Sequence, residues 1–187
     1  MKYSQRAFLV MTALILIGVF ISGAECGQAL DIKQITVNAV VNTIFQSSIN
    51  PKIIELHEQG HKILLGEGCV TVSIISNTPF TVYFRTANPD GNIHDNSSYL
   101  ETFYIILPSG SPPPSVNDQR WMSGATLNSH TETSNSSNEY KKDIYIKAIK
   151  DNPPYGMKDY IDTVTITAKS GDGSASIMQF QVVYRQR

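Results

Sequence analysis

Alternation of apolar and polar side chains is most regular near the C-terminus, in residues 160–168. In an extended chain, Ile161 and three threonines lie on one side, whereas Asp162 and three apolar residues lie on the other. β-Branched and aromatic side chains favour a pleated, half-buried surface. A glycine-rich stretch at 171–174 follows, and the alternation resumes in 177–184. The two segments therefore predict a hairpin of two long strands.

Several earlier segments show the same strand-like pattern, and turn residues such as Asn50-Pro51 separate them. The turn at Asn77-Thr78-Pro79 predicts a second hairpin between its flanking segments, and residues 52–65 fit either a short strand pair or a helix. The strands predicted before the closing hairpin are 31–49, 69–76, 80–86, 99–107 and 143–150. This spacing, with almost no helix, predicts an all-β fold, an antiparallel β-sandwich of 7–8 strands.

Residues 108–138 differ from the rest of the chain. They hold three consecutive prolines, many small polar residues and few large apolar ones. A polar loop of about 30 residues is long for a compact domain, so we expect it to be functional or mobile. Four aromatic residues border this loop, namely Tyr99, Phe103, Tyr104 and Trp121. They either form a recognition surface for a glycan or protein or pack in the core.

The N-terminus has the pattern of an export signal. Lys2 and Arg6 precede an apolar run at 7–21, and small residues follow up to Ala24. An apolar run of this length is short for a membrane span, so the pattern predicts a signal peptide that is removed after Ala24. A cut after Ala29 is the alternative. In either case we expect a secreted or cell-surface protein with no membrane span after cleavage.

The net charge of the chain bears on whether its partners are proteins or nucleic acids. The whole chain has a formal net charge of −1, and loss of residues 1–24 removes two cations and no anions, which leaves about −3. The remaining domain, at 30–187, has no basic patch of the kind that nucleic acids require. We therefore expect protein partners and no nucleic acid.

Only two cysteines are present, Cys26 and Cys69. In an exported protein they allow one disulfide, but a cut after Ala29 removes Cys26 and leaves Cys69 alone. The sequence leaves both states open.

One short motif raises the question of metal chemistry. His57-Glu58-Gln59-Gly60-His61 satisfies H-E-x-x-H, in which one face of a helix presents two imidazoles to zinc and the glutamate activates the bound water. Gly60 disfavours a short helix, and the segment lies between two strongly strand-like regions. The favoured interpretation is an exposed polar connection over 55–62, with no metal, no cofactor and no enzymatic activity. A small zinc peptidase remains the third hypothesis.

Two segments resemble subunits of chaperone–usher fimbriae, which are exported, pilin-like β-sandwich proteins. Q-I-T-V-N-A-V-V at 34–41 resembles the N-terminal strand that such subunits donate to a neighbour, and Y-I-D-T-V-T-I-T at 160–167 is similar to their final strand. Residues 70–84 also look like the inner hairpin of these and related bacterial Ig-like domains. The resemblance implies an Ig-like β-sandwich with a structural or adhesive role at the cell surface.

The same resemblance implies how such a chain assembles. The apolar residues inserted into the next subunit would be Ile35, Val37, Ala39 and Val41, so copies of the chain would join by strand addition. Subunits of that kind stop soon after the Y-x-D-T-V-T strand, whereas this chain continues through residues 171–187. A further strand there predicts a sandwich completed within one molecule. The alternative hypothesis is therefore a self-complete Ig-like module that binds a glycan or protein through the 108–138 loop.

Overall fold

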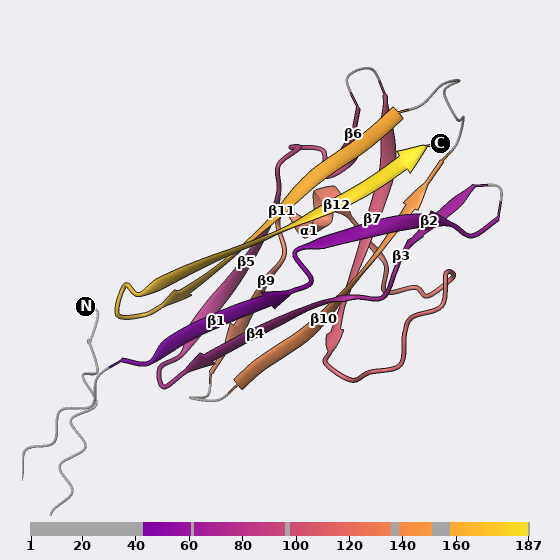
Figure 1. Ribbon diagram of the computed structural model, residues 1–187. Coiled ribbons are helices and arrows are strands. Elements are labelled where there is room, and N and C mark those ends of the chain that lie inside the picture. The colour runs from indigo at the N-terminus through magenta and orange to yellow at the C-terminus, as the bar shows by residue number, and fades with distance from the viewer. Residues whose placement is uncertain (1–42, 61, 96–97, 136–138, 151–157, 187) are drawn as a thin grey trace, which may run out of the picture. The chain divides into compact units, whose positions relative to one another are not determined.

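The computed structural model describes residues 43–60, 62–95, 98–135, 139–150 and 158–186. These residues form twelve strands and one short helix, so the prediction of an all-β fold is confirmed (Figure 1). The elements are β1 (Phe45–Asn50), β2 (Ile53–Glu58), β3 (Ile63–Gly66), β4 (Val70–Ser76), β5 (Phe80–Thr86), β6 (Ile93–His94), β7 (Tyr99–Pro108), β8 (Met122–Ser123), α1 (Gly124–Leu127), β9 (Thr131–Ser134), β10 (Glu139–Ile149), β11 (Lys158–Ser170) and β12 (Ala175–Gln186).

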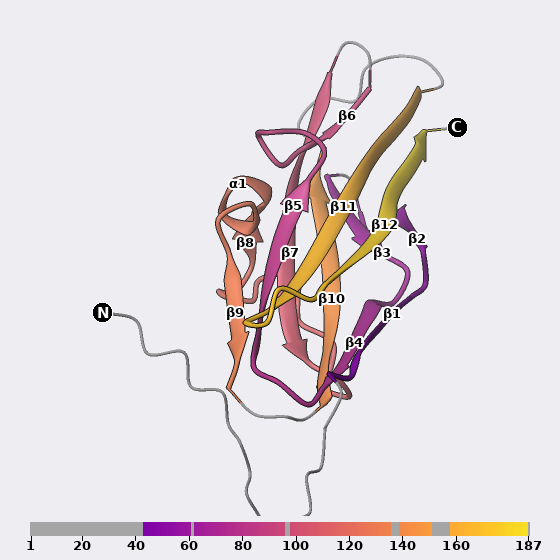
Figure 2. The ribbon, with the colours of Figure 1, turned by 90° about the vertical axis from the view of Figure 1, so that its left-hand side faces the viewer.

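Most of these strands belong to two groups of antiparallel neighbours. In the first group β4 lies between β1 and β10, and β10 also pairs with β7. In the second group β11 lies between β5 and β12, and β9 extends the β5 edge (Figure 2). Each group buries one face of its strands, as the two-residue period of the sequence requires.

Short strands join the two groups at both edges. The hairpin of β2 and β3 pairs with β12 through β2 and with β10 through β3. On the other side, β6 pairs with both β11 and β7. The hydrogen-bonded network therefore closes on itself, and all its pairings are antiparallel except that between β2 and β12. Closure removes most of the open strand edges at which other chains could pair.

The core lies between the inward faces of the two groups. From β11 it receives Val164, Ile166 and Ala168, none of which is exposed, and from β12 it receives Phe180 and Val182. Burial of a side chain such as Phe180 stabilises a fold by roughly 1.5–3 kcal/mol. The threonines that alternate with the buried residues of β11 lie on its outer face.

Two predictions about local structure need correction. First, residues 69–76 and 80–86 do form β4 and β5, but these strands do not pair, because β4 pairs with β1 and β10 whereas β5 pairs with β11 and β9. Ser76 Oγ donates to the Thr78 carbonyl at 2.8 Å and accepts from the Thr78 amide at 3.1 Å. This tight polar turn moves the chain from one group of strands to the other.

The second correction concerns the number of strands. The sequence predicted 7–8, whereas the described residues form twelve. Several of the additional strands arise because longer strands are interrupted. Residues 51–52 separate β1 from β2, and residues 67–69 separate β3 from β4. Of the others, β6 is a two-residue strand just before β7, and β8 and β9 lie together with α1 inside the segment that was expected to be a polar loop.

Candidate functional site

The closing hairpin occupies the place where the resemblance to fimbrial subunits implies a missing strand. β11 and β12 pair through twelve residue pairs, from Lys158 with Gln186 to Lys169 with Ala175. The predicted hairpin is therefore confirmed. On its other edge β12 pairs with β2 over Gln181–Val183, and the Gln181 amide donates to the Lys52 carbonyl at 2.8 Å. The last strand is thus provided by the chain itself.

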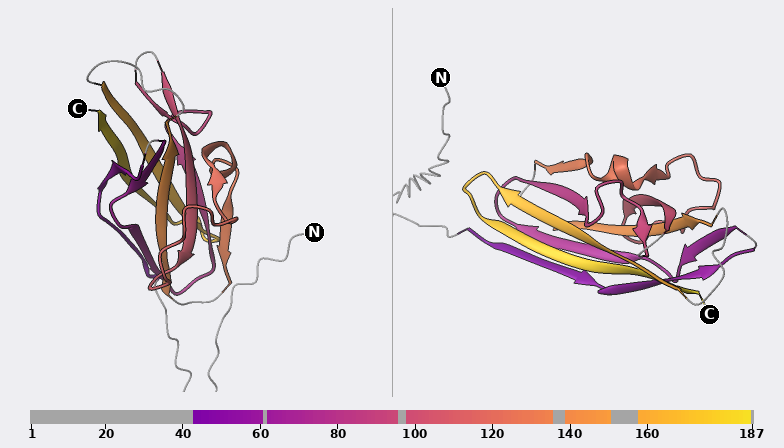
Figure 3. Two further views of the ribbon diagram at one scale, coloured as in Figure 1. Left: turned by 90° about the vertical axis from the view of Figure 1, so that its right-hand side faces the viewer. Right: turned by 90° about the horizontal axis from the view of Figure 1, so that it is seen from above.

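β1 runs alongside the first half of β12 (Figure 3). The two strands meet through side chains, since the hydroxyls of Ser47 and Ser176 form a hydrogen bond. At the same end of the hairpin, Thr43 Oγ1 donates to an oxygen of Asp172 at 2.6 Å. The first described residues are therefore attached to the tip of the closing hairpin.

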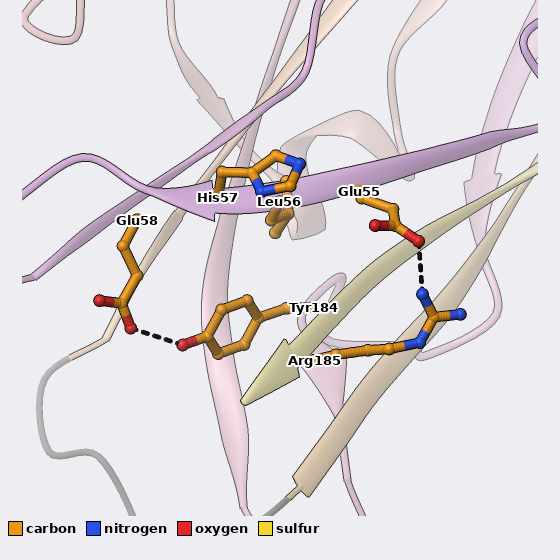
Figure 4. A pocket seen from close by; sticks show the side chains of 6 residues that line it. All are labelled: Glu55, Leu56, His57, Glu58, Tyr184 and Arg185. Atoms are coloured by element: carbon orange, nitrogen blue, oxygen red, sulfur yellow. Dashed lines mark hydrogen bonds and ion pairs between the residues drawn. The ribbon is translucent and has the colours of Figure 1, made fainter. Parts of the chain in front are cut away.

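A cleft of about 410 Å³ opens where β2 and β12 diverge (Figure 4). The two strands pair through only three residue pairs, and β2 then continues with β3 alone. The residues that line the cleft are Glu55, Leu56, His57, Glu58, Tyr184 and Arg185. All but Leu56 have polar side chains.

The charges in this cleft neutralise one another. Tyr184 Oη donates to Glu58 Oε1 at 2.8 Å, and the Lys150 ammonium lies 3.0 Å from the same carboxylate oxygen. Burial would lower the pKa of Lys150, but its hydrogen bonds to Tyr184 and Glu58 outweigh burial and raise it. Glu55 forms an ion pair with Arg185. These contacts connect the end of β12 to β2 and to the residue that follows β10. The side chains that line the cleft therefore brace the end of the closing hairpin.

The zinc hypothesis requires a helix that includes His57 and Glu58, but both residues lie in a strand. His57 and Glu58 are consecutive residues of β2, so their side chains point to opposite sides of the strand (Figure 4). His57 Nε2 lies 3.4 Å from the Glu67 carboxylate. His61 lies outside the described residues, and within the described ranges no three histidines, cysteines or acids are grouped so as to hold a metal ion. The predicted polar connection is also corrected, because 55–58 belong to a strand.

Several predicted features lie outside the described residues. The four residues of the predicted donor strand, Ile35, Val37, Ala39 and Val41, precede residue 43, as do the predicted signal peptide and Cys26. Cys69 is described, is half-buried and forms no disulfide with another described residue. In the described part of the chain, no helix is long and apolar enough to cross a membrane.

The aromatic residues beside the 108–138 segment take different roles. Tyr104 is fully buried, whereas Tyr99 is 60% exposed. Phe103 and Trp121 are half-buried. The Lys147 ammonium lies 5.0 Å from the centre of the Phe103 ring and 4.8 Å from that of the Trp121 ring. Partial burial lowers the pKa of Lys147. Of the two interpretations of these aromatics, core packing holds in full only for Tyr104.

A few side-chain contacts hold the 108–121 part of this segment against β10 and stabilise it internally. Lys147 Nζ donates to the Val116 carbonyl at 3.0 Å, and Trp121 Nε1 donates to the Ser115 carbonyl at 2.9 Å. Asp118 pairs with Arg120 at 2.7 Å, and this pairing lowers the pKa of Asp118 to about 2. The segment is therefore anchored by a few side chains and not by a strand ladder.

The next part of the segment packs on the turn between β5 and β6. Gly91 and Gly124 touch through their backbones, and a Cβ atom on Gly124 would lie only 1.9 Å from the Gly91 carbonyl oxygen. Gly91 also has a φ of 76°, which side chains rarely permit. Asn128 Oδ1 accepts from the Thr86 amide at 2.7 Å. α1 is thereby fixed beside β5, and β9 follows along the β5 edge.

Asp162 is the one acid that the alternation places inside the closing hairpin, and it is 2% exposed. Its Oδ1 accepts from the Thr163 amide at 2.8 Å and from the Ala87 amide at 3.1 Å. Its Oδ2 is buried and accepts from no described residue. Burial raises the pKa of Asp162 to about 6, although the amide hydrogen bonds lower it. This carboxyl fastens the turn after β5 to β11.

A group of residues that sequence reasoning missed lies on the outer face of β5, β9, β11 and β12. Because Val82 and Phe84 are buried, Tyr83 and Arg85 point to the opposite side of β5. Tyr83 is paired with Thr167 and is 39% exposed, and the Lys169 ammonium lies 5.7 Å from its ring centre. The alternation in 80–86 contained this signal, but it was interpreted only as evidence for a strand.

Comparisons with known proteins give structural similarities only. No protein-family model and no curated protein matches the chain. Among solved structures, the chain is similar to CfaE, the adhesive subunit of CFA/I fimbria of enterotoxigenic Escherichia coli, at 15% identity and a TM-score of 0.44, over 72% of this chain and 45% of CfaE. It is also similar to the Salmonella enterica SafA pilin in complex with the SafB chaperone, at 10% identity and a TM-score of 0.39, over 78% and 56%.

A third similarity is to a PapD-like domain of human CEP192, at 12% identity and a TM-score of 0.39, over 83% of this chain and 98% of that domain. The chain spans less than half the length of CfaE. Fimbrial proteins and PapD-like domains are thus among the structures that this chain resembles.

Proposed function

We propose that the fold is an Ig-like β-sandwich. In the constant type of immunoglobulin domain, strands A, B, E and D form one sheet and C, F and G the other. Here β1 with β2, β3 with β4, β10 and β7 have the neighbours expected of A, B, E and D. β5, β11 and β12 have those expected of C, F and G. The interrupted first two strands account for two of the five strands beyond seven, and β6, β8 and β9 are the other three.

We further propose that the chain is an exported, non-enzymatic cell-surface protein that acts in adhesion as a self-complete binding module. The observation that carries this proposal is the twelve-pair ladder between β11 and β12. With that ladder formed, and with β2 on its other edge, the domain needs no strand from a neighbour. Its interactions then depend on exposed surfaces, among them the 108–138 segment and the strand faces.

The test is the association state of the purified protein. We expect the chain without residues 25–42 to remain folded, soluble and monomeric in size-exclusion chromatography, because the described core closes without them. The matched variant lacks residues 175–187 and so loses β12. We expect that variant to aggregate through the exposed core. Aggregation of the N-terminal deletion would contradict the proposal.

A second candidate function is strand donation by residues 34–41. It is favoured by the phase of β1, in which the odd-numbered residues Phe45 and Ile49 are half-buried and pack against the core. The odd-numbered Ile35, Val37, Ala39 and Val41 continue this phase toward the N-terminus. An extended segment with this pattern is suited to strand addition at the edge of another sheet.

Charge substitutions test strand donation separately. Val37→Asp with Ala39→Asp places charges on the apolar side of the segment, whereas Asn38→Asp places one on the polar side. If the segment joins copies of the chain, the first variant loses oligomers in multi-angle light scattering and the second keeps them. If the two variants show the same oligomeric state, strand donation by residues 34–41 is wrong.

A further inference from the structure

The outer face of β5, β9, β11 and β12 has an unusual charge composition for this chain. Across the outward positions of 81–85, 131–133, 163–169 and 175–181 there are two cations, Arg85 and Lys169, and no acid. The whole chain has a formal net charge of −1. Among the described residues no carboxylate pairs with either cation. This face is therefore locally positive on an acidic protein.

Most of the uncharged groups of the face are hydrogen-bonding groups, and the exceptions are Ala175 and Ile177, of which Ile177 is 68% exposed. Six of the outward positions are threonines, at 81, 131, 133, 163, 165 and 167, and two are glutamines, at 179 and 181. Gln179 Nε2 donates to Thr165 Oγ1 at 3.1 Å, which sets the direction of the amide. Thr131 and Thr133 come from β9, so the 108–138 segment extends this face. The strands lie side by side in Figure 2.

The aromatic ring of the face lies between its two cations. Arg85 pairs with Thr165 and Lys169 pairs with Thr81, so the Cα atoms of the two cations are roughly 13 Å apart along the strand direction, and the Lys169 ammonium lies 5.7 Å from the centre of the Tyr83 ring. Tyr83 pairs with Thr167, midway between them. The order along the sheet is therefore cation, ring, cation, with hydroxyls and amides on both sides.

We propose that this face binds an extended glycan that carries carboxylate groups, such as one with sialic or uronic acids. The Arg85 guanidinium presents a planar fork that matches a carboxylate, and the exposed Tyr83 ring offers a flat surface for the apolar side of a sugar. The threonines and glutamines both donate and accept, as sugar hydroxyls do. This inference rests on the proposed function as a binding module and names its ligand class.

The ratio of charged to neutral groups favours carboxylated over sulfated glycans. Two cations among about a dozen outward positions match a ligand with few charges and many hydroxyls. A heavily sulfated chain requires a denser basic patch, since its binding is dominated by charge. A basic protein partner is disfavoured by the same two cations.

The experiment measures binding of the purified chain to sialyllactose, lactose and heparin by calorimetry and glycan array. We expect binding to sialyllactose and at least tenfold weaker binding to lactose, because loss of a charge-assisted hydrogen bond has about this effect. Arg85→Ala should weaken sialyllactose binding about tenfold and Tyr83→Ala several-fold. Lys141→Ala is the matched control, because Lys141 is an exposed cation on β10, in the other group of strands.

Equal binding of the Arg85→Ala variant and the wild type would overturn this inference. Equal binding of lactose and sialyllactose, or binding of heparin alone, would also overturn it. If the chain instead binds a glycan or protein that substitutions at Trp121 disrupt and Arg85→Ala does not, the inference fails and the proposed function stands. Loss of binding with Lys141→Ala as well would indicate a nonspecific charge effect and also overturn it.

Discussion

The closing hairpin and the described part of the 108–138 segment lie against the same core but are held there in different ways. The hairpin has a continuous ladder of twelve pairs and buries alternate side chains along most of its length. The segment has two short strands, one turn of helix and contacts such as that of Lys147 with Trp121. A ladder distributes its stability over many residues, whereas a few point contacts concentrate it. The hairpin should therefore determine whether the domain folds, and the segment should vary without unfolding it.

The largest expected effect is loss of the hairpin core. Phe180→Ala removes a side chain that is 1% exposed, and the cavity should lower the free energy of unfolding by about 3–5 kcal/mol. Gln179→Ala, at the exposed neighbouring position, should change it by less than about 0.5 kcal/mol. Urea denaturation followed by circular dichroism measures both. Similar losses in the two variants would mean that the inward and outward faces have been assigned incorrectly.

The next effect depends on pH. Folded Asp162 takes up its proton at about pH 6, whereas the unfolded carboxyl does so near 3.8. The native state therefore binds the proton more tightly, and the stability that this provides is present below about pH 3.8 and lost as pH rises through about 6. Relative to Asp162→Asn, the wild type should gain at most about 3 kcal/mol between pH 7 and pH 4.

Urea midpoints of the wild type and the Asp162→Asn variant at pH 4, 5, 6 and 7 test this. Other carboxyls of the fold titrate in both proteins, so only the difference between the two curves reports on Asp162. A difference that grows as pH rises toward 7 in favour of the wild type would contradict the burial of this carboxyl.

A smaller effect is expected at the brace between β2 and the end of the hairpin. Glu58→Gln removes the charge that faces Lys150 and Tyr184. Because the glutamate is itself more than half exposed, we expect a loss of only about 1 kcal/mol. Hydrogen exchange should show the change as faster exchange of the last residues of β12, with the hairpin turn at 171–174 unaffected. Uniformly faster exchange along β12 would mean that the brace supports the whole strand.

The smallest expected effect on stability lies in the segment itself. Trp121→Ala removes one ring beside Lys147 and should lower the free energy of unfolding by about 1 kcal/mol or less. Exchange of the amides in 109–121 should nevertheless accelerate more than that of β7 or β10. A loss as large as that of Phe180→Ala would end the distinction between the two regions.

Period-two alternation was sufficient to predict most long strands, because each of them buries one face and exposes the other. Residues 80–86 were predicted with the bounds that the structure shows, and 160–168 and 177–184 lie inside β11 and β12. The alternation is a local property of each strand, so it can be recognised without knowing which other strands that strand pairs with.

Pairing between strands was harder to predict, because it depends on distant residues. The turn after Ser76 has hairpin-like residues, yet β4 finds its partners in β1 and β10. The parallel pairing of β2 with β12 joins the two ends of the described chain and has no local signal. The outer face with Tyr83 and Arg85 was missed for the same reason, since its residues come together only through the register of four strands.

The parallel contact of β2 with β12 also has a consequence for the order of folding. Strands from opposite ends of the chain must meet before the core is covered, and contacts of such high sequence separation fold slowly. Until β12 is made, the sheet is open between β11 and β2, so the core is exposed at that edge. A nascent chain would thus complete its fold only after β12 has been synthesised.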